Sequence, residues 1–309
     1  MSALGPNRGP GHFLAVGVLV IGLLGLAGLG ARALHPAAAP AAVTSAPSPQ
    51  TGALEDATPL VIDARSGLLL DLDSDAVLWQ RDPDSVRPVA SIAKIFTAME
   101  AVDLMGWWDR PIRVPAAIAD LPSDSTMMGL RAGEILTTRE LIDGLFLASG
   151  NDAAVTLAMG ATPEPVFVEG MNSLAARLQL HSTHFANPVG LDDPGQHSSA
   201  NDLAVAARYL TQSYPGLAAI ASMRAIDLPA AAGHHGFRLR NLNSLLTTYP
   251  GATGLKGGYT GDALGCVVTT ASRGRHHLLA VVLGSRAAFA DSRALLDHGF
   301  AALNSGSRR

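Results

Sequence analysis

The sequence of 309 residues has little of several chemically active side chains. It contains a single cysteine, Cys266, so it can form no intramolecular disulfide and no zinc or iron–sulfur site built on several thiolates. Charged residues make up only 16% of the chain, and acidic residues slightly outnumber basic ones, which gives a formal net charge of −4. A nucleic-acid-binding protein needs a basic surface that neutralises phosphates, so this composition argues against that class.

Lysine is nearly absent. Of the 22 basic residues only Lys94 and Lys256 are lysines, and all others are arginines. Arginine stays protonated in proteins, whereas a lysine amine can lose its proton when it is desolvated. A lysine in such a sequence is explained either by chance or by a need for an amine that can become neutral. Both lysines are therefore the first residues to consider for catalysis.

The N-terminal part of the sequence differs in composition from the rest. Residues 13–29 form an uncharged apolar run, and a small-x-small sequence follows at residues 31–33. We therefore expect residues 1–33 to be a signal peptide or an N-terminal membrane anchor, and residues 34–56, rich in alanine, proline and serine, to be a linker. Both interpretations of residues 1–33 predict an extracytoplasmic protein of the cell envelope, either secreted or tethered to the cytoplasmic membrane.

Residues 57–305 are expected to form one domain, since 48% of the chain is hydrophobic and can build a core. Strand patterns occur near both ends of this segment, at residues 60–62, 68–72, 76–80, 267–270 and 278–283. Helical patterns occur at residues 92–104, 138–148, 152–159, 165–178, 200–210 and 289–303. This order predicts an α+β fold in which both termini build an antiparallel sheet flanked by helices, with an inserted, mostly helical lobe.

Ser91 and Lys94 are three residues apart at the start of the helical pattern, which places their side chains on one helix face. A serine hydroxyl becomes a nucleophile when a base takes its proton, and a neutral amine one turn away can be that base. The amine needs a lowered pKa, which desolvation or a second cation such as Lys256 provides. Alternatively, Ser91 is a helix N-cap and Lys94 is solvated, as S-x-x-K most often is when it stands alone.

Two further segments contain candidate residues. Ser149-Gly150-Asn151 lies between two predicted helices, where it is either a capped loop or a hydroxyl that relays protons beside an amide that binds substrate. Lys256-Gly257-Gly258-Tyr259-Thr260 precedes a predicted strand, where its glycines either form an ordinary turn or allow another backbone to approach closely. Each segment is a weak signal alone, but a chance occurrence of all three in this order is improbable.

The three segments resemble the S-x-x-K, S-x-N and K-T-G signature of the serine penicillin-binding proteins and β-lactamases. Among these, the sequence is most similar to the low-molecular-mass D-alanyl-D-alanine carboxypeptidases, peptidase family S11, along essentially the whole predicted domain. The segments that carry this similarity are residues 61–67, 88–94, 147–154, 185–191, 199–202 and 295–300.

The resemblance implies a β-lactamase/transpeptidase-like fold and a serine D,D-carboxypeptidase that removes the terminal D-alanine from peptidoglycan stem peptides. Ser91 would attack the substrate carbonyl and Lys94 would accept its proton. Ser149 and Lys256 would pass a proton to the leaving D-alanine, and β-lactams would acylate the same serine. No cofactor and no metal are implied. The residues implied to bind substrate are Asn151, Gly257, Gly258, Tyr259 and Thr260, with the N–H groups of Ser91 and Tyr259 forming an oxyanion hole.

Two positions depart from the family pattern. Gly257 stands where the family usually has a threonine whose hydroxyl binds the substrate's terminal carboxylate, and Ala288 stands where it often has an arginine. One lost hydrogen bond to a charged group, worth ~1.5–3 kcal/mol, would weaken turnover roughly ten- to a hundredfold. An attenuated or non-catalytic binder of wall peptides or penicillin therefore stays open as an alternative. A β-lactamase is less favoured, because Gly150 replaces the aspartate of Ser-Asp-Asn.

Overall fold

The computed structural model describes residues 60–106 and 108–306. The expected signal peptide or anchor at residues 1–33 and the expected linker at residues 34–56 lie outside the described residues, as do the first three residues of the expected domain. Among the helices of the described part, none combines the length and the apolar character needed to cross a membrane.

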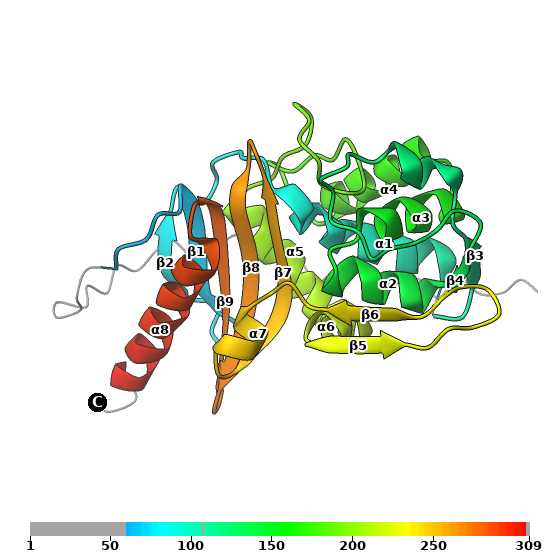
Figure 1. The fold of residues 1–309 in the computed structure, drawn as a ribbon. Helices are drawn as coiled ribbons and strands as arrows, with labels where there is room; N and C mark the ends of the chain where they lie inside the picture. Colours follow the sequence, from blue (N-terminus) through cyan, green and yellow to red (C-terminus); the bar gives the residue numbers. More distant parts are fainter. Residues whose placement is uncertain (1–59, 107, 307–309) are drawn as a thin grey trace, which may run out of the picture. The chain divides into compact units, whose positions relative to one another are not determined.

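Strands from both ends of the described chain form a five-stranded sheet in the order β2-β1-β9-β8-β7 (Figure 1). All neighbouring strands are antiparallel, and the central pairing of β1 with β9 joins Ser66 to Leu283 and Asp71 to Leu278. This confirms the antiparallel sheet built from both ends, with two corrections: residues 60–62 form no strand, and β7, which includes the glycine segment expected to precede a strand, is itself the strand at one edge. The strands are β1 (Ser66–Asp71), β2 (Val77–Arg81), β7 (Ala252–Thr260), β8 (Leu264–Arg273) and β9 (His276–Ser285).

Helices cover both faces of the sheet, which is why the inner residues of β8 and β9 are buried almost without interruption. On one face α8 (Ala288–Gly306) packs Leu295 and Phe300 against Leu69 and Leu278 (Figure 1). On the other face the sheet adjoins α5 (Ala200–Ser213) and the helical lobe in a single larger core.

The chain between β2 and β7 forms the predicted helical lobe, with α1 at its centre (Figure 1). Every residue of α1 from Lys94 to Val102 is buried. α2 begins with a capping box, in which Thr137 and Glu140 exchange side-chain and backbone hydrogen bonds. The helices are α1 (Lys94–Met105), α2 (Thr138–Leu147), α3 (Asn151–Ala161), α4 (Glu164–Arg177), α5 (Ala200–Ser213) and α6 (Pro215–Ala221).

Short elements that the sequence patterns did not indicate lie between the larger ones. Two small antiparallel sheets pair β3 with β4 and β5 with β6. Two 3₁₀ turns, η1 and η2, and one short helix, α7, connect the larger elements. Their bounds are β3 (Pro111–Arg113), β4 (Ile135–Thr137), β5 (Ala225–Leu228), β6 (Phe237–Arg240), η1 (Ala90–Ala93), η2 (Ala116–Asp120) and α7 (Leu245–Thr248).

Candidate active site

Ser91 and Lys94 lie where η1 leads into α1, and η1 contacts β7 and β8 of the sheet. The periodicity predicted a helix from residue 92, but the α-helix begins at Lys94 and a 3₁₀ turn carries Ser91. Lys94 is fully buried, and its Nζ lies 2.8 Å from Ser91 Oγ. The two side chains are therefore within hydrogen-bond distance, as their spacing suggested.

Two more oxygen atoms surround the Lys94 amine. Asn151 Oδ1 and the carbonyl oxygen of Val189 each lie 2.7 Å from Nζ. Burial lowers the pKa of Lys94 well below its ordinary value, the charge of Lys256 lowers it further, and Asp152 partly opposes both effects. These effects favour the neutral amine, which is the form that can accept a proton.

Ser149 and Lys256 form a second pair of the same kind. Ser149 lies between α2 and α3, and its Oγ is 2.9 Å from Nζ of Lys256, which also donates to the carbonyl oxygen of Gly257 at 2.7 Å. Lys256 is buried on β7, and burial lowers the pKa of its amine to about 7. Because Asn151 stands two residues after Ser149 and contacts Lys94, the Ser-Gly-Asn segment joins both pairs.

The backbone of β7 passes directly against the candidate nucleophile at Gly258. A Cβ atom at this position would lie 2.6 Å from the nitrogen of Ser91 and 3.0 Å from Cβ of Ala90, so glycine alone fits without a shift. Tyr259 follows with a side chain that is 71% exposed. The N–H group of Ser91 and the β7 backbone thus lie side by side, where the sequence suggested an oxyanion hole.

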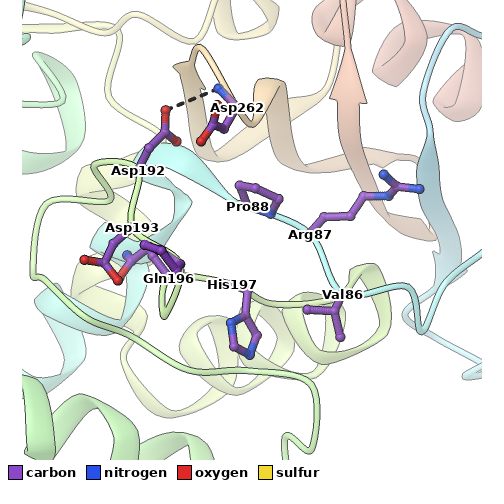
Figure 2. A pocket seen from close by; sticks show the side chains of 9 residues that line it. Val86, Arg87, Pro88, Asp192, Asp193, Gln196, His197 and Asp262 are labelled. Carbon is purple, nitrogen blue, oxygen red and sulfur yellow. Dashed lines mark hydrogen bonds between the residues drawn. The ribbon is translucent and has the colours of Figure 1, made fainter.

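Thr260 ends β7, and its hydroxyl donates to Oδ1 of Asp192. The other carboxylate oxygen of Asp192 accepts the backbone N–H of Asp262 at 3.2 Å (Figure 2). Both aspartates line a cavity of about 330 Å³ that also includes Gln196 and His197. The Thr260 side chain is therefore held by Asp192, one of the residues that line this cavity.

Of the two residues that depart from the family pattern, Gly257 lies beside an aromatic ring and Ala288 is buried. A Cβ atom at Gly257 would lie 3.0 Å from Cζ of Phe289 in α8, so this ring fills the space next to the glycine. Ala288 is buried at the start of α8. Arg286, which precedes it by two residues, pairs with Asp63, and its hydrogen bonds lower the pKa of that carboxyl to about 2.

Sequence reasoning missed two residues that hold this site together. The carboxylate of buried Asp152 accepts the backbone N–H groups of residues 128–130, each at 2.9 Å, and so fixes this loop beside the start of α3. Its position directly after Asn151 was the signal that could have found it. Val189 contacts Lys94 through its backbone carbonyl group, and every residue type has such a group, so the sequence could not have indicated this contact.

Comparisons with known protein sequences point to one family. The sequence model of the family described as D-alanyl-D-alanine carboxypeptidase, Peptidase_S11, matches residues 53–287. The D-alanyl-D-alanine carboxypeptidase DacB2 of Mycobacterium tuberculosis is 37% identical over 246 residues, which are 77% of this chain and 82% of that protein. DacF of Bacillus subtilis, also named a D-alanyl-D-alanine carboxypeptidase, is 34% identical over 230 residues, which are 73% of this chain and 58% of DacF.

Solved structures agree with this result. A D-alanyl-D-alanine carboxypeptidase from Mycobacterium tuberculosis superposes with a TM-score of 0.72 at 34% identity, covering 80% of this chain and 95% of that one. A DD-transpeptidase from Streptomyces superposes with a TM-score of 0.73 at 27% identity, covering 79% of this chain and 100% of that one. The fold is thus the one that the three sequence segments implied.

Proposed function

The chain belongs to the D-alanyl-D-alanine carboxypeptidases of peptidase family S11, and we propose that its serine D,D-carboxypeptidase activity runs through an acyl-enzyme on Ser91. The substrate is a peptidoglycan stem peptide that ends in D-Ala-D-Ala, and β-lactams acylate the same serine. The observation that supports this assignment is the 2.8 Å distance between Lys94 Nζ and Ser91 Oγ. A buried amine with a lowered pKa is the base that a serine nucleophile needs.

Acylation breaks the peptide bond between the two terminal D-alanines. Ser91 Oγ attacks the carbonyl carbon while Lys94 takes the hydroxyl proton, and the carbonyl oxygen becomes an oxyanion that backbone N–H groups of Ser91 and Tyr259 stabilise. The carbon–nitrogen bond then breaks. Ser149 gives its proton to the leaving amine and regains one from Lys256, so D-alanine departs and an ester remains on Ser91.

Deacylation returns the enzyme to its starting state. After acylation Lys94 carries the Ser91 proton and Lys256 has given one up, so neutral Lys256 takes a proton from water through Ser149 while the water oxygen attacks the ester carbonyl carbon. The bond to Ser91 Oγ breaks, Lys94 returns its proton to that oxygen, and the shortened stem peptide loses its acid proton to solvent and leaves as a carboxylate. A substrate in the cell wall is in keeping with an extracytoplasmic location, and residues 1–33 would export the domain or hold it at the membrane.

Release of D-alanine from a pentapeptide that ends in D-Ala-D-Ala, measured beside labelling by a fluorescent penicillin, tests the proposal. We expect wild-type protein to release D-alanine and to be labelled, and Ser91→Ala to do neither. Ser123→Ala, at an exposed serine outside the site, is the control and should behave as wild type. Labelling that survives in Ser91→Ala would show that the nucleophile is another residue.

The same two readouts separate the alternative functions. Stable labelling without release of D-alanine would indicate a non-catalytic binder, the alternative that the Phe289 ring beside Gly257 favours. Rapid loss of the label with release of hydrolysed penicillin would indicate a β-lactamase. Labelling together with release of D-alanine supports the D,D-carboxypeptidase.

A further inference from the structure

The Lys94 amine has three oxygen neighbours, but a neutral amine has only two N–H bonds and one lone pair. Asn151 Oδ1 and the Val189 carbonyl oxygen can only accept hydrogen bonds, whereas Ser91 Oγ carries a hydrogen of its own. The two N–H bonds of the neutral amine therefore go to Asn151 and Val189. The lone pair is left facing the Ser91 hydroxyl, and this orientation depends on both acceptors staying in place.

The Val189 carbonyl group belongs to a turn that the side chain of Asn187 closes. Oδ1 of Asn187 accepts the backbone N–H groups of Val189 at 3.3 Å, Gly190 at 2.8 Å and Leu191 at 3.1 Å. Its Nδ2 donates to the carbonyl oxygen of Leu191 at 3.1 Å. One amide thus makes four hydrogen bonds within the turn, which a short turn cannot replace with backbone bonds of its own.

The same turn is fixed to both ends of the segment that carries the nucleophile and the base. In α1, Thr97 donates through Oγ1 to the carbonyl oxygen of Pro188 at 2.6 Å. On the other side, Gly190 has a φ of 85°, and a Cβ atom there would lie 2.1 Å from the carbonyl oxygen of Ala90. A turn packed this closely cannot change its shape without moving the Val189 carbonyl group relative to Lys94.

We infer that Asn187 is a positioning residue for catalysis: it shapes the turn whose Val189 carbonyl oxygen orients the Lys94 lone pair toward Ser91. Asn187 acts through the backbone and takes no part in proton transfer itself. The inference rests on the proposed function, because it concerns the residue proposed there as the base. It requires that a change at Asn187 slows acylation without weakening the binding that precedes it.

Three variants isolate this role. Asn187→Ala removes all four hydrogen bonds of the amide. Asn187→Asp keeps an oxygen acceptor for the three N–H groups but adds a negative charge, which raises the pKa of Lys94. Asn172→Ala is the matched control, because Asn172 binds the same 185–191 segment through both backbone groups of Phe185, at 2.8 and 2.9 Å, and makes no hydrogen bond to the turn. The acylation rate constant and the dissociation constant for a fluorescent penicillin are measured for each across the pH range, as ratios to wild type.

The expected results differ in their dependence on pH. Asn187→Ala lowers the acylation rate constant about 10- to 100-fold at every pH, with an unchanged dissociation constant, because deprotonation does not restore the direction of the lone pair. Asn187→Asp is slow at low pH, and its ratio to wild type rises toward one as the pH increases, because it loses only the Nδ2 bond to Leu191, keeps the three N–H bonds that shape the turn, and the amine again becomes neutral. Asn172→Ala acylates at the wild-type rate.

Two outcomes would overturn the inference. One is an Asn187→Ala rate equal to that of Asn172→Ala, and the other is an Asn187→Asp deficit that persists as the pH rises. If thermal unfolding shows that Asn187→Ala does not fold, Asn187→Asp decides alone, since it keeps the acceptor. Wild-type protein that is not labelled, or Ser91→Ala that still is, would instead refute the proposed function. Labelled wild type with an unaffected Asn187→Ala refutes the positioning role alone.

Discussion

Lys256 Nζ donates to Ser149 Oγ at 2.9 Å, across 107 residues of sequence. The lysine comes from the edge strand of the sheet and the serine from the turn between two helices of the lobe, so the two parts of the fold meet at this hydrogen bond. The buried charge of Lys256 lowers the pKa of Lys94, which favours catalysis, but its burial disfavours the folded state. These two effects of one residue can be measured separately.

Removing the charge of Lys256 should move the acidic limb of the pH–acylation profile to higher pH. Acylation needs neutral Lys94, and without the neighbouring cation the pKa of Lys94 rises, so Lys256→Met becomes slower at low pH. Lys256→Arg retains a cation and should keep the limb near its wild-type position. Labelling rates with a fluorescent penicillin, measured from acidic to alkaline pH, give the limb for each variant. An identical limb in Lys256→Met would show that the charge does not act on the base.

Lys256 should also destabilise the folded protein at neutral pH. Its pKa is lowered from 10.5 to about 7, so between these values the unfolded state binds more protons, and stability rises with pH across this window. The shift of ~3.5 units corresponds to an upper limit of ~5 kcal/mol, and the hydrogen bonds to Ser149 and Gly257 offset part of it. We expect Lys256→Met to raise the free energy of unfolding by roughly 1–3 kcal/mol at pH 7.

The pH dependence of the stability gain in Lys256→Met shows whether the buried charge causes it. The advantage of Lys256→Met should be largest below pH 7 and should shrink as the pH rises toward 10.5, above which the lysine is neutral in both states. Denaturant unfolding of wild type and variant at neutral and alkaline pH measures the difference. A gain of equal size at both would assign the effect to packing rather than to the buried charge.

Most large elements of the fold were predictable because they carry a periodic signal, but β7 was not, since glycines at positions 254, 257 and 258 interrupt its pattern. The strands at both ends and the helices between them follow from apolar spacing, and the closing helix α8 contains the predicted residues 289–303. The two-stranded sheets β3–β4 and β5–β6 have strands of three or four residues, too few to show alternation. The 3₁₀ start of α1 depends on Ala90, whose φ of 50° no propensity would indicate.

The site was predictable only in part. The spacing of Ser91 and Lys94 indicated one pair. The scarcity of lysine pointed to Lys256, the Ser-Gly-Asn segment was a weak signal for Ser149, and the resemblance to a family joined the two. The contacts that orient Lys94 could not be predicted in this way, because Val189 uses its backbone carbonyl group and lies 95 residues further along the chain. Such a contact is fixed by tertiary packing and leaves no pattern of side chains in the sequence.

A methyl group at Gly258 should disrupt the site more than one at Gly261. In Gly258→Ala the added Cβ would lie 2.6 Å from the Ser91 nitrogen, so β7 or η1 must move and the proposed oxyanion donors separate. Loss of one such donor costs about 10²–10³ in rate, and we expect acylation to fall by that amount. Gly261→Ala is the matched control, because nothing lies within 4 Å of a Cβ atom there. Equal penicillin-labelling rates in the two variants would contradict this account.

A hydroxyl group at position 257 should improve recognition of a free terminal carboxylate once Phe289 makes room for it. In Gly257→Thr the new Cβ would lie 3.0 Å from Cζ of Phe289, so the change is combined with Phe289→Leu. A hydrogen bond to a carboxylate is worth ~1.5–3 kcal/mol, and we expect kcat/KM for a D-Ala-D-Ala peptide to rise about tenfold or more over Phe289→Leu alone.

Two comparisons show whether the hydroxyl itself causes the gain at position 257. Gly257→Val in the same Phe289→Leu background has nearly the shape of threonine but lacks the donor, so it should show no increase in kcat/KM. A peptide whose C-terminus is amidated should gain nothing from the threonine either, because a neutral amide forms a weaker hydrogen bond than a carboxylate does. Equal rates for threonine and valine would mean that the terminal carboxylate is bound away from β7, and that Gly257 does not limit turnover.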